Sequence, residues 1–145
     1  MSGTVKLEQQ EDFHFAIRFG DAIPLLHADE APPLGKGAGP NPEQLLAAAV
    51  GNCLSDSLLF ALRKFKQQPE PLRTTVETTV GRNAENRLRV RHFAVRITLG
   101  VPASALQHLD RALAQFESFC TVAESVRQGI PVDVEVYDST GARLK

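Results

Sequence analysis

One long helix most constrains the fold of this chain. Asn41 is a preferred N-cap residue, Pro42 suits the first helical position, and Gln44 stands where a capping-box side chain reaches back to the cap. Apolar and small residues then recur on one broad face, namely Leu45, Leu46, Ala49, Cys53, Leu54, Ser57, Leu58, Phe60 and Ala61. This face continues to about Lys64, which is long for a surface helix. Residues 41–64 are therefore predicted to form a central helix.

Gly51 interrupts this helix just before Cys53. A glycine inside a helix costs about 1 kcal/mol relative to alanine, so its presence here needs a structural reason. We predict that another backbone approaches the helix closely at Gly51, and that Cys53 packs against a neighbouring helix.

Strands are predicted on both sides of the central helix. Phenylalanine or isoleucine alternates with polar or small residues over 13–19, the two-residue period of a half-buried sheet, and 23–27 is a candidate return strand. After the helix, alternation predicts two long strands over 72–80 and 88–99, joined as a hairpin. A last strand is predicted over 131–137, where valines alternate with acidic residues.

A second helix is predicted between the hairpin and the last strand. From about Ala103, apolar residues recur at steps of three and four and place Cys120 on a buried stripe, with Gly129 as the C-terminal cap. Thr121 and Glu124 also match a capping box, which predicts instead that the helix breaks at Cys120 and restarts. The sequence leaves both interpretations open.

These elements indicate an α+β fold in a single domain spanning 1–145. Antiparallel strands pack around long helices, and there are no repeated strand-helix-strand crossovers of the kind that build a parallel sheet. The central helix is too apolar to be covered by so few strands in a monomer, and uncovered apolar surface usually meets another protein. We therefore expect a homodimer.

Composition excludes several functional classes. The net charge is -1 and no basic stripe is present, so nucleic acid is not an expected partner. The first residues lack the apolar core of a signal peptide, and no run of about 18 apolar residues predicts a membrane span. We expect a soluble, cytoplasmic protein.

The two cysteines, Cys53 and Cys120, are the leading candidates for chemistry. A reducing compartment opens ordinary disulfides, so a redox or metal role is favoured over a structural bridge. No metal is predicted, because none of the four histidines lies within five residues of a cysteine. A papain-like nucleophile has no local signature here. Burial as small hydrophobic side chains would also account for both cysteines.

The start of the central helix carries a specific motif. The residues NPEQLLAAA at 41–49 lead to Gly51, Asn52 and Cys53. This pattern resembles the signature of the OsmC and Ohr family of peroxide reductases. The spacing from Glu43 to Cys53, a second cysteine in a late helix and a valine-rich final strand are also similar to that family. The resemblance covers essentially the whole chain beyond its first dozen residues.

The resemblance implies an intertwined homodimer with thiol peroxidase activity. Cys53 is implied to attack the peroxide and become a sulfenic acid, which Cys120 resolves as a disulfide. This order agrees with thiol chemistry, in which the thiolate attacks and a nearby second thiol condenses with the sulfenic acid. Arg18, held by Glu43, is implied to supply the cation that activates the thiol. No bound cofactor is implied, and an external dithiol returns the electrons.

Two further expectations concern the substrate and the subunits. Apolar residues around Cys53 favour organic hydroperoxides. Ten residues of helix place Glu43 about 15 Å from Cys53, so we predict a site shared between two subunits.

One departure from the family pattern keeps rival functions open. Thr121 follows Cys120 where proline is common in the family. The main alternative is a redox-sensing or apolar-ligand-binding protein on the same fold, without peroxidase turnover. A further alternative is a structural dimer whose core cysteines are inert.

Overall fold

The computed structural model describes residues 3–129, 132–140 and 142–145. The N-terminal part is a three-stranded antiparallel sheet in the order β1 (Lys6–Glu11), β2 (His14–Arg18) and β3 (Leu26–Ala28). The long helix α1 (Pro42–Lys64) comes next. It is followed by an antiparallel hairpin of β4 (Arg73–Arg82) and β5 (Leu88–Thr98). These elements confirm the predicted α+β class.

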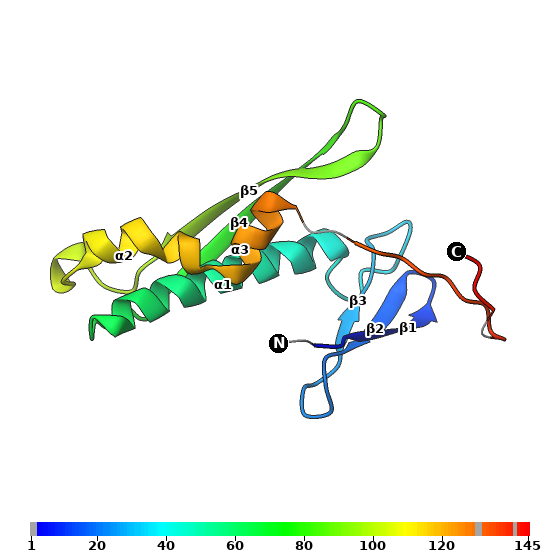
Figure 1. Cartoon of the computed structure of the whole chain (residues 1–145), viewed down its shortest axis with the longest axis horizontal. Coiled ribbons are helices and arrows are strands. Elements are labelled where there is room, and N and C mark those ends of the chain that lie inside the picture. The colour runs from blue at the N-terminus through cyan, green and yellow to red at the C-terminus, as the bar shows by residue number, and fades with distance from the viewer. Residues whose placement is uncertain (1–2, 130–131, 141) are drawn as a thin grey trace.

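Short helical elements follow the hairpin. They are η1 (Ala103–Ala105), α2 (Leu109–Gln115), η2 (Phe116–Phe119) and α3 (Thr121–Gln128). In Figure 1, α2 and α3 run alongside α1, and α1 lies along the hairpin. The N-terminal sheet lies beside the first turns of α1, away from α2.

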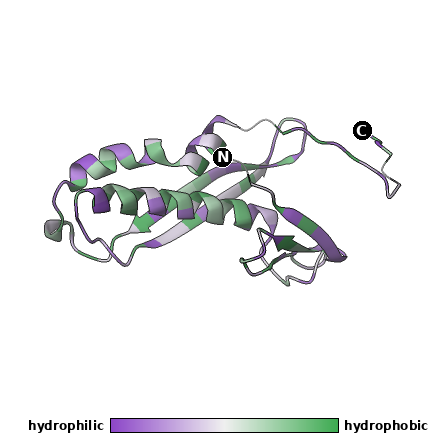
Figure 2. Ribbon diagram, turned by 60° about the horizontal axis from the view of Figure 1, so that its bottom comes forward, coloured by the Kyte–Doolittle hydropathy of each residue, from purple (hydrophilic) through white to green (hydrophobic). Residues whose placement is uncertain are grey.

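The helix α1 begins with the predicted capping box. The Asn41 side-chain oxygen accepts a hydrogen bond from the Gln44 backbone N–H at 2.9 Å, and the Gln44 side chain accepts one from the Asn41 N–H at 2.9 Å. The helix then runs without a break for 23 residues to Lys64. By length and composition it is apolar enough to cross a membrane. Here it packs on β4, β5 and the three elements from α2 to α3, and Figure 2 shows hydrophobic residues along its ribbon, so its apolar character serves the core.

One face of the hairpin meets α1. The cross-strand pairs Val76 with Val95 and Thr78 with Phe93 lie on this face, and Val95 and Phe93 pack against the core. A serine of α1 adds a polar contact, because Ser55 Oγ lies 2.6 Å from Thr74 Oγ1. The outer face of the hairpin is exposed and largely polar. This period-two pattern is what the sequence predicted for the two long strands, which are confirmed.

The loop between β3 and α1 is organised by a buried carboxylate. Asp29 is only 3% exposed, and its side chain accepts hydrogen bonds from the backbone N–H groups of Glu30, Lys36 and Ala38. These bonds, the one from Ala38 most of all, lower the pKa of Asp29 against the opposing effect of burial. The Asp29 backbone N–H also reaches the Pro40 carbonyl at 3.1 Å. The loop thereby holds the start of α1 close to the N-terminal sheet.

Strand boundaries near the N-terminus differ from the expectation. The return strand expected over 23–27 is β3, Leu26–Ala28, which starts later because Pro24 has no N–H to donate to a ladder. The strand β1 was not predicted, because its sequence is mostly polar and it is exposed along its whole length. It pairs with β2 as an edge strand, a position that tolerates polar residues.

The second predicted helix is broken. Instead of one helix from Ala103 to Gly129, the chain forms η1, α2, η2 and α3, and the break at Cys120 is the second of the two interpretations. The cap of α3 is Cys120 itself, one residue earlier than the Thr121 capping box predicted. Gly129 is the C-terminal cap as expected, with a φ of 78°.

The prediction of a last strand over 131–137 is wrong for the residues that the structure describes. Residues 132–136 are extended without a sheet, and Pro131 lies outside the described residues. Tyr137 makes only an isolated bridge with Arg143. A strand needs a neighbour to accept its ladder hydrogen bonds, and no named strand pairs with this segment within the chain.

Gly51 marks the closest approach of α1 to the hairpin. A Cβ added there would lie 2.6 Å from Val76 Cγ2, which is a side-chain atom of β4. The close approach that we predicted is therefore present, but it is to a side chain and not to a backbone. Valine is stiff about its first side-chain torsion and cannot easily move aside. The glycine is therefore required by helix-to-sheet packing.

We expect Gly51→Ala to lower the free energy of unfolding, although alanine raises helix propensity by about 1 kcal/mol. In a Val76→Ala background the clash is removed, so the same substitution should raise the free energy of unfolding. Urea denaturation of the four proteins of this cycle measures both effects. Equal destabilisation in the two backgrounds would show that Val76 is not the cause.

Candidate functional site

The fold brings Cys53 and Cys120 into contact. Cys53 lies in the middle of α1 and is half-buried, whereas Cys120 lies between η2 and α3 and is 0% exposed. Their side chains are within hydrogen-bonding reach, and both are free thiols. The prediction that Cys53 packs against a neighbouring helix is confirmed. Cys53 packs against α3 and against Cys120, which is the N-terminal cap of that helix.

The break before α3 is what points Cys120 at α1. Its backbone is extended, with φ of −78° and ψ of 102°, and its sulfur caps the helix by accepting a hydrogen bond from the Ala123 N–H at 3.4 Å. Ser57, one turn beyond Cys53 on α1, lies close enough to the same sulfur to lower the pKa of Cys120 slightly. Cys120 is therefore held by α3 on one side and by α1 on the other.

Burial raises the pKa of the Cys120 thiol, and the hydrogen bond with Cys53 raises it further. The bonds from Ala123 and Ser57 act in the opposite direction but are outweighed. Burial and the Cys53 contact therefore both favour the protonated form of the Cys120 thiol. Of the two thiols, the one that also reaches solvent is Cys53.

A cleft of 530 Å³ opens beside Cys53. Its floor is one face of α1, formed by residues that recur at steps of three and four: Cys53, Asp56, Ser57, Phe60, Ala61 and Lys64. Its wall comes from α2, η2 and the start of α3, with Arg111, Ala112, Gln115, Phe119 and Thr121, and Phe65 closes the end. This volume is in the range of small-molecule sites.

Comparison with known proteins identifies the family. The OsmC-like protein family matches residues 35–135, which is more than half of the chain. The chain belongs to the OsmC-like family. A search of curated proteins found no match.

Solved structures share the OsmC-like fold at low sequence identity. An OsmC-like protein of unknown function from Vibrio cholerae is 17% identical, with a TM-score of 0.70 over 86% of this chain and 93% of that one. An organic hydroperoxide resistance protein OsmC from Legionella pneumophila is 20% identical, with a TM-score of 0.60 over 88% and 90%. The organic hydroperoxide resistance protein OhrB of Bacillus subtilis is 15% identical, with a TM-score of 0.65 over 92% and 96%.

Two of the predicted site residues lie away from the cleft within one chain. Glu43 is in the first turn of α1, and because the helix is continuous, ten residues separate it from Cys53 by about 15 Å. Arg18 is exposed on β2 and lines a surface hollow of the N-terminal sheet with Lys6 and His27. Neither residue lines the cleft beside Cys53.

The sequence did not single out the polar residues that do line the cleft. Ser57 follows Cys53 by one helical turn, so helical spacing alone predicts that it shares the face. Arg111 had no such signal, because its place depends on how α2 folds back along α1. Among the described residues, no three His, Cys, Asp or Glu side chains gather closely enough to hold a metal ion.

The raised pKa of Cys120 makes a pH-dependent contribution to stability. Because the pKa is higher in the folded state, this contribution is complete below the ordinary thiol value of about 8.5 and is lost as the pH rises through the folded value. We expect the free energy of unfolding of the reduced protein to fall as the pH rises above the ordinary thiol value of about 8.5. Urea denaturation with reductant present measures it.

The control for this prediction is the slope of stability against pH in two variants. Cys120→Ala should show a smaller fall, while Cys53→Ser should keep most of it, because burial is the larger cause. The same slope in wild type and Cys120→Ala would contradict a buried, protonated Cys120.

Proposed function

We propose that this OsmC-like protein is a two-cysteine peroxidase that reduces organic hydroperoxides. The observation that carries the proposal is the contact between Cys53 and Cys120 at one end of an apolar cleft. The half-buried thiol faces the cleft and the fully buried thiol lies behind it. That is the order in which an attacking and a resolving cysteine are needed.

The proposed reaction has three steps. The Cys53 thiolate attacks the outer peroxide oxygen, the O–O bond breaks, and the alkoxide takes a proton to leave as an alcohol, with Cys53 oxidised to a sulfenic acid. Cys120 then forms an S–S bond with Cys53, and its proton leaves with the hydroxyl as water. An external dithiol of the cytoplasm reduces the disulfide and is itself oxidised to a disulfide.

The cleft favours an organic substrate over hydrogen peroxide. Phe60 and Phe119 are 72% and 74% exposed at its edges, and Ala61 and Ala112 line it between them. Apolar groups of a bound hydroperoxide would remove these surfaces from water, at roughly 25 cal/mol for each Å² buried. Hydrogen peroxide has no such groups.

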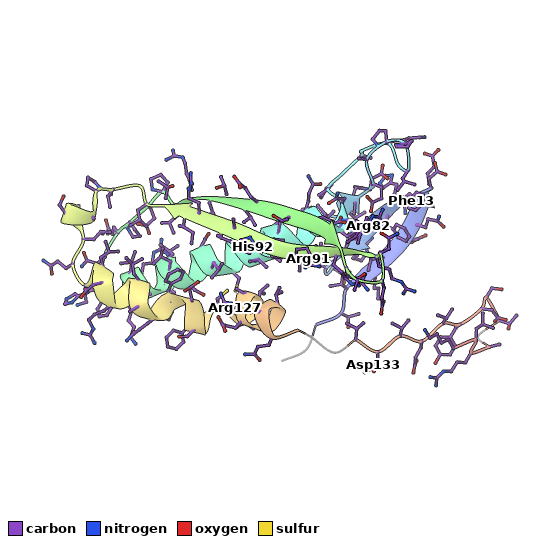
Figure 3. All side chains as sticks on the ribbon, turned by 90° about the horizontal axis from the view of Figure 1, so that it is seen from above. Phe13, Arg82, Arg91, His92, Arg127 and Asp133 are labelled. Atoms are coloured by element: carbon purple, nitrogen blue, oxygen red, sulfur yellow. The ribbon has the colours of Figure 1, made fainter. Side chains whose placement is uncertain are left out.

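The large exposed surface outside the cleft supports a homodimer. The isolated chain exposes 11131 Å², against about 7,300 Å² expected for a compact monomer of 15.8 kDa. The valines of 132–136 are exposed on a segment that leads away from α3, where Figure 3 marks Asp133. In Figure 1 the β4–β5 hairpin also extends beyond the helices. A second copy that covers these surfaces would give the segment a strand partner.

A dimer would also complete the active site. Arg18 and Glu43 are too far from Cys53 in one chain to act together with it, so we propose that the partner subunit supplies them. An arginine beside Cys53 would favour its thiolate form, and a glutamate would hold that arginine in place.

Substitution of each cysteine tests the peroxidase mechanism. With cumene hydroperoxide and dithiothreitol, Cys53→Ser should lose turnover, because no other described thiol reaches the cleft. Without dithiothreitol, Cys120→Ser should consume one equivalent of peroxide rapidly and leave Cys53 as a sulfenic acid. Peroxide consumption and mass spectrometry follow both. Equal rates in wild type and Cys53→Ser would reject the mechanism, and unmodified thiols with a co-purified apolar ligand would favour the binding alternative.

Subunit complementation tests the shared site. Cys53→Ser and Arg18→Ala should each be inactive alone, but their co-expressed heterodimer combines an intact Cys53 from one subunit with an intact Arg18 from the other. We expect partial recovery of peroxide reduction in the mixed sample. A mixed dimer made from Arg18→Ala and the double variant Cys53→Ser/Arg18→Ala is the control, because it keeps one Cys53 and has no Arg18 in either subunit. No recovery in purified heterodimers would place Arg18 outside a shared site.

A further inference from the structure

The cleft beside Cys53 changes character along its length. Cys53 is at one end of the floor and Lys64 at the other, eleven residues along α1, or about 16 Å. Between them the lining is mainly apolar, with Phe60 and Ala61 on the floor and Phe119 on the wall. The cleft therefore has a thiol end, an apolar middle and a cationic end.

Arg111 provides the second cation of that end. Its guanidinium carbon lies 5.5 Å from the centre of the Phe65 ring, and this ring stacks in turn on His108 with centroids 4.9 Å apart. A cation held over an aromatic face is attracted by the ring and is already positioned for a ligand. The wall and the floor of the cleft thus each contribute one positive charge.

Neither cation is neutralised within the described residues. Four arginines and lysines elsewhere in that part of the chain pair with carboxylates, but Lys64 and Arg111 make no salt bridge. The acidic side chain in the cleft, Asp56, belongs to the Cys53 end and accepts a hydrogen bond from Asn52 at 2.9 Å. Two unpaired cations at the end of an apolar cleft are complementary to an anionic group on an apolar chain.

We propose that Lys64 and Arg111 form an anion subsite for the terminal carboxylate of a single-chain hydroperoxide whose peroxide group lies at Cys53. The inference rests on the proposed peroxidase function and assigns these two residues a role in substrate specificity. A guanidinium matches a carboxylate through two parallel hydrogen bonds, and lysine adds a point charge. The distance of about 16 Å between the ends requires a long apolar chain between carboxylate and peroxide.

The test compares linoleic acid hydroperoxide with its methyl ester, which keeps the chain and removes the charge. Wild type should show a higher kcat/KM for the acid. Arg111→Met combined with Lys64→Met should reduce that preference about tenfold or more, mainly through KM for the acid. Arg111→Glu should reverse the preference in favour of the ester. Arg96→Met, on the exposed outer face of the hairpin, removes one positive charge outside the cleft and should keep the wild-type preference.

The outcomes separate this proposal from the peroxidase function. If wild type reduces cumene hydroperoxide but shows no preference for the acid over the ester, the subsite is rejected and the peroxidase stands. If the preference survives in the double variant, Lys64 and Arg111 are not the subsite. If wild type reduces no hydroperoxide, calorimetric titration of the same proteins with linoleic acid decides. Weaker binding to the double variant than to Arg96→Met supports the subsite, and equal binding overturns it.

Discussion

Packing on two sides of α1 determines the rest of this structure. On one side Gly51 lets the helix approach Val76 of the hairpin, where a larger residue would clash. On another side Val50 and Leu54 join Ala123 and the buried Cys120 in a common core. Because a single helix carries both contacts, the positions of the hairpin and of α3 are linked through it.

The chemistry of the site follows from that packing. Cys120 is buried because its sulfur caps α3 while α3 packs on α1, and burial together with Cys53 raises its pKa. The cleft follows from the same geometry, since α2 and η2 run back along the face of α1 that carries Cys53. Structural and reactive features therefore share residues, as in other sites built on rigid elements.

The surfaces left open are as informative as the core. A long hairpin and an exposed valine segment that leads away from the helices would be unusual together in a compact monomer. They belong to one proposed arrangement, in which a second copy covers the apolar surface and contributes Arg18 and Glu43. The OsmC-like fold of the chain is established by the family match, whereas this arrangement and the activity remain our proposals.

The sequence alone determined the local structure. The capping box at Asn41, the length of α1 and the alternation of the two long strands all depend on near neighbours, so they were predictable. The sequence also singled out the two cysteines as candidates, and the structure places them in contact. Tertiary structure decided the break at Cys120, the approach of Val76 to Gly51 and the place of Arg111 in the cleft. Each depends on contacts between residues distant in the chain, which local patterns do not encode. The extended form of 132–136 has the same origin, because a strand forms only where a partner strand lies beside it.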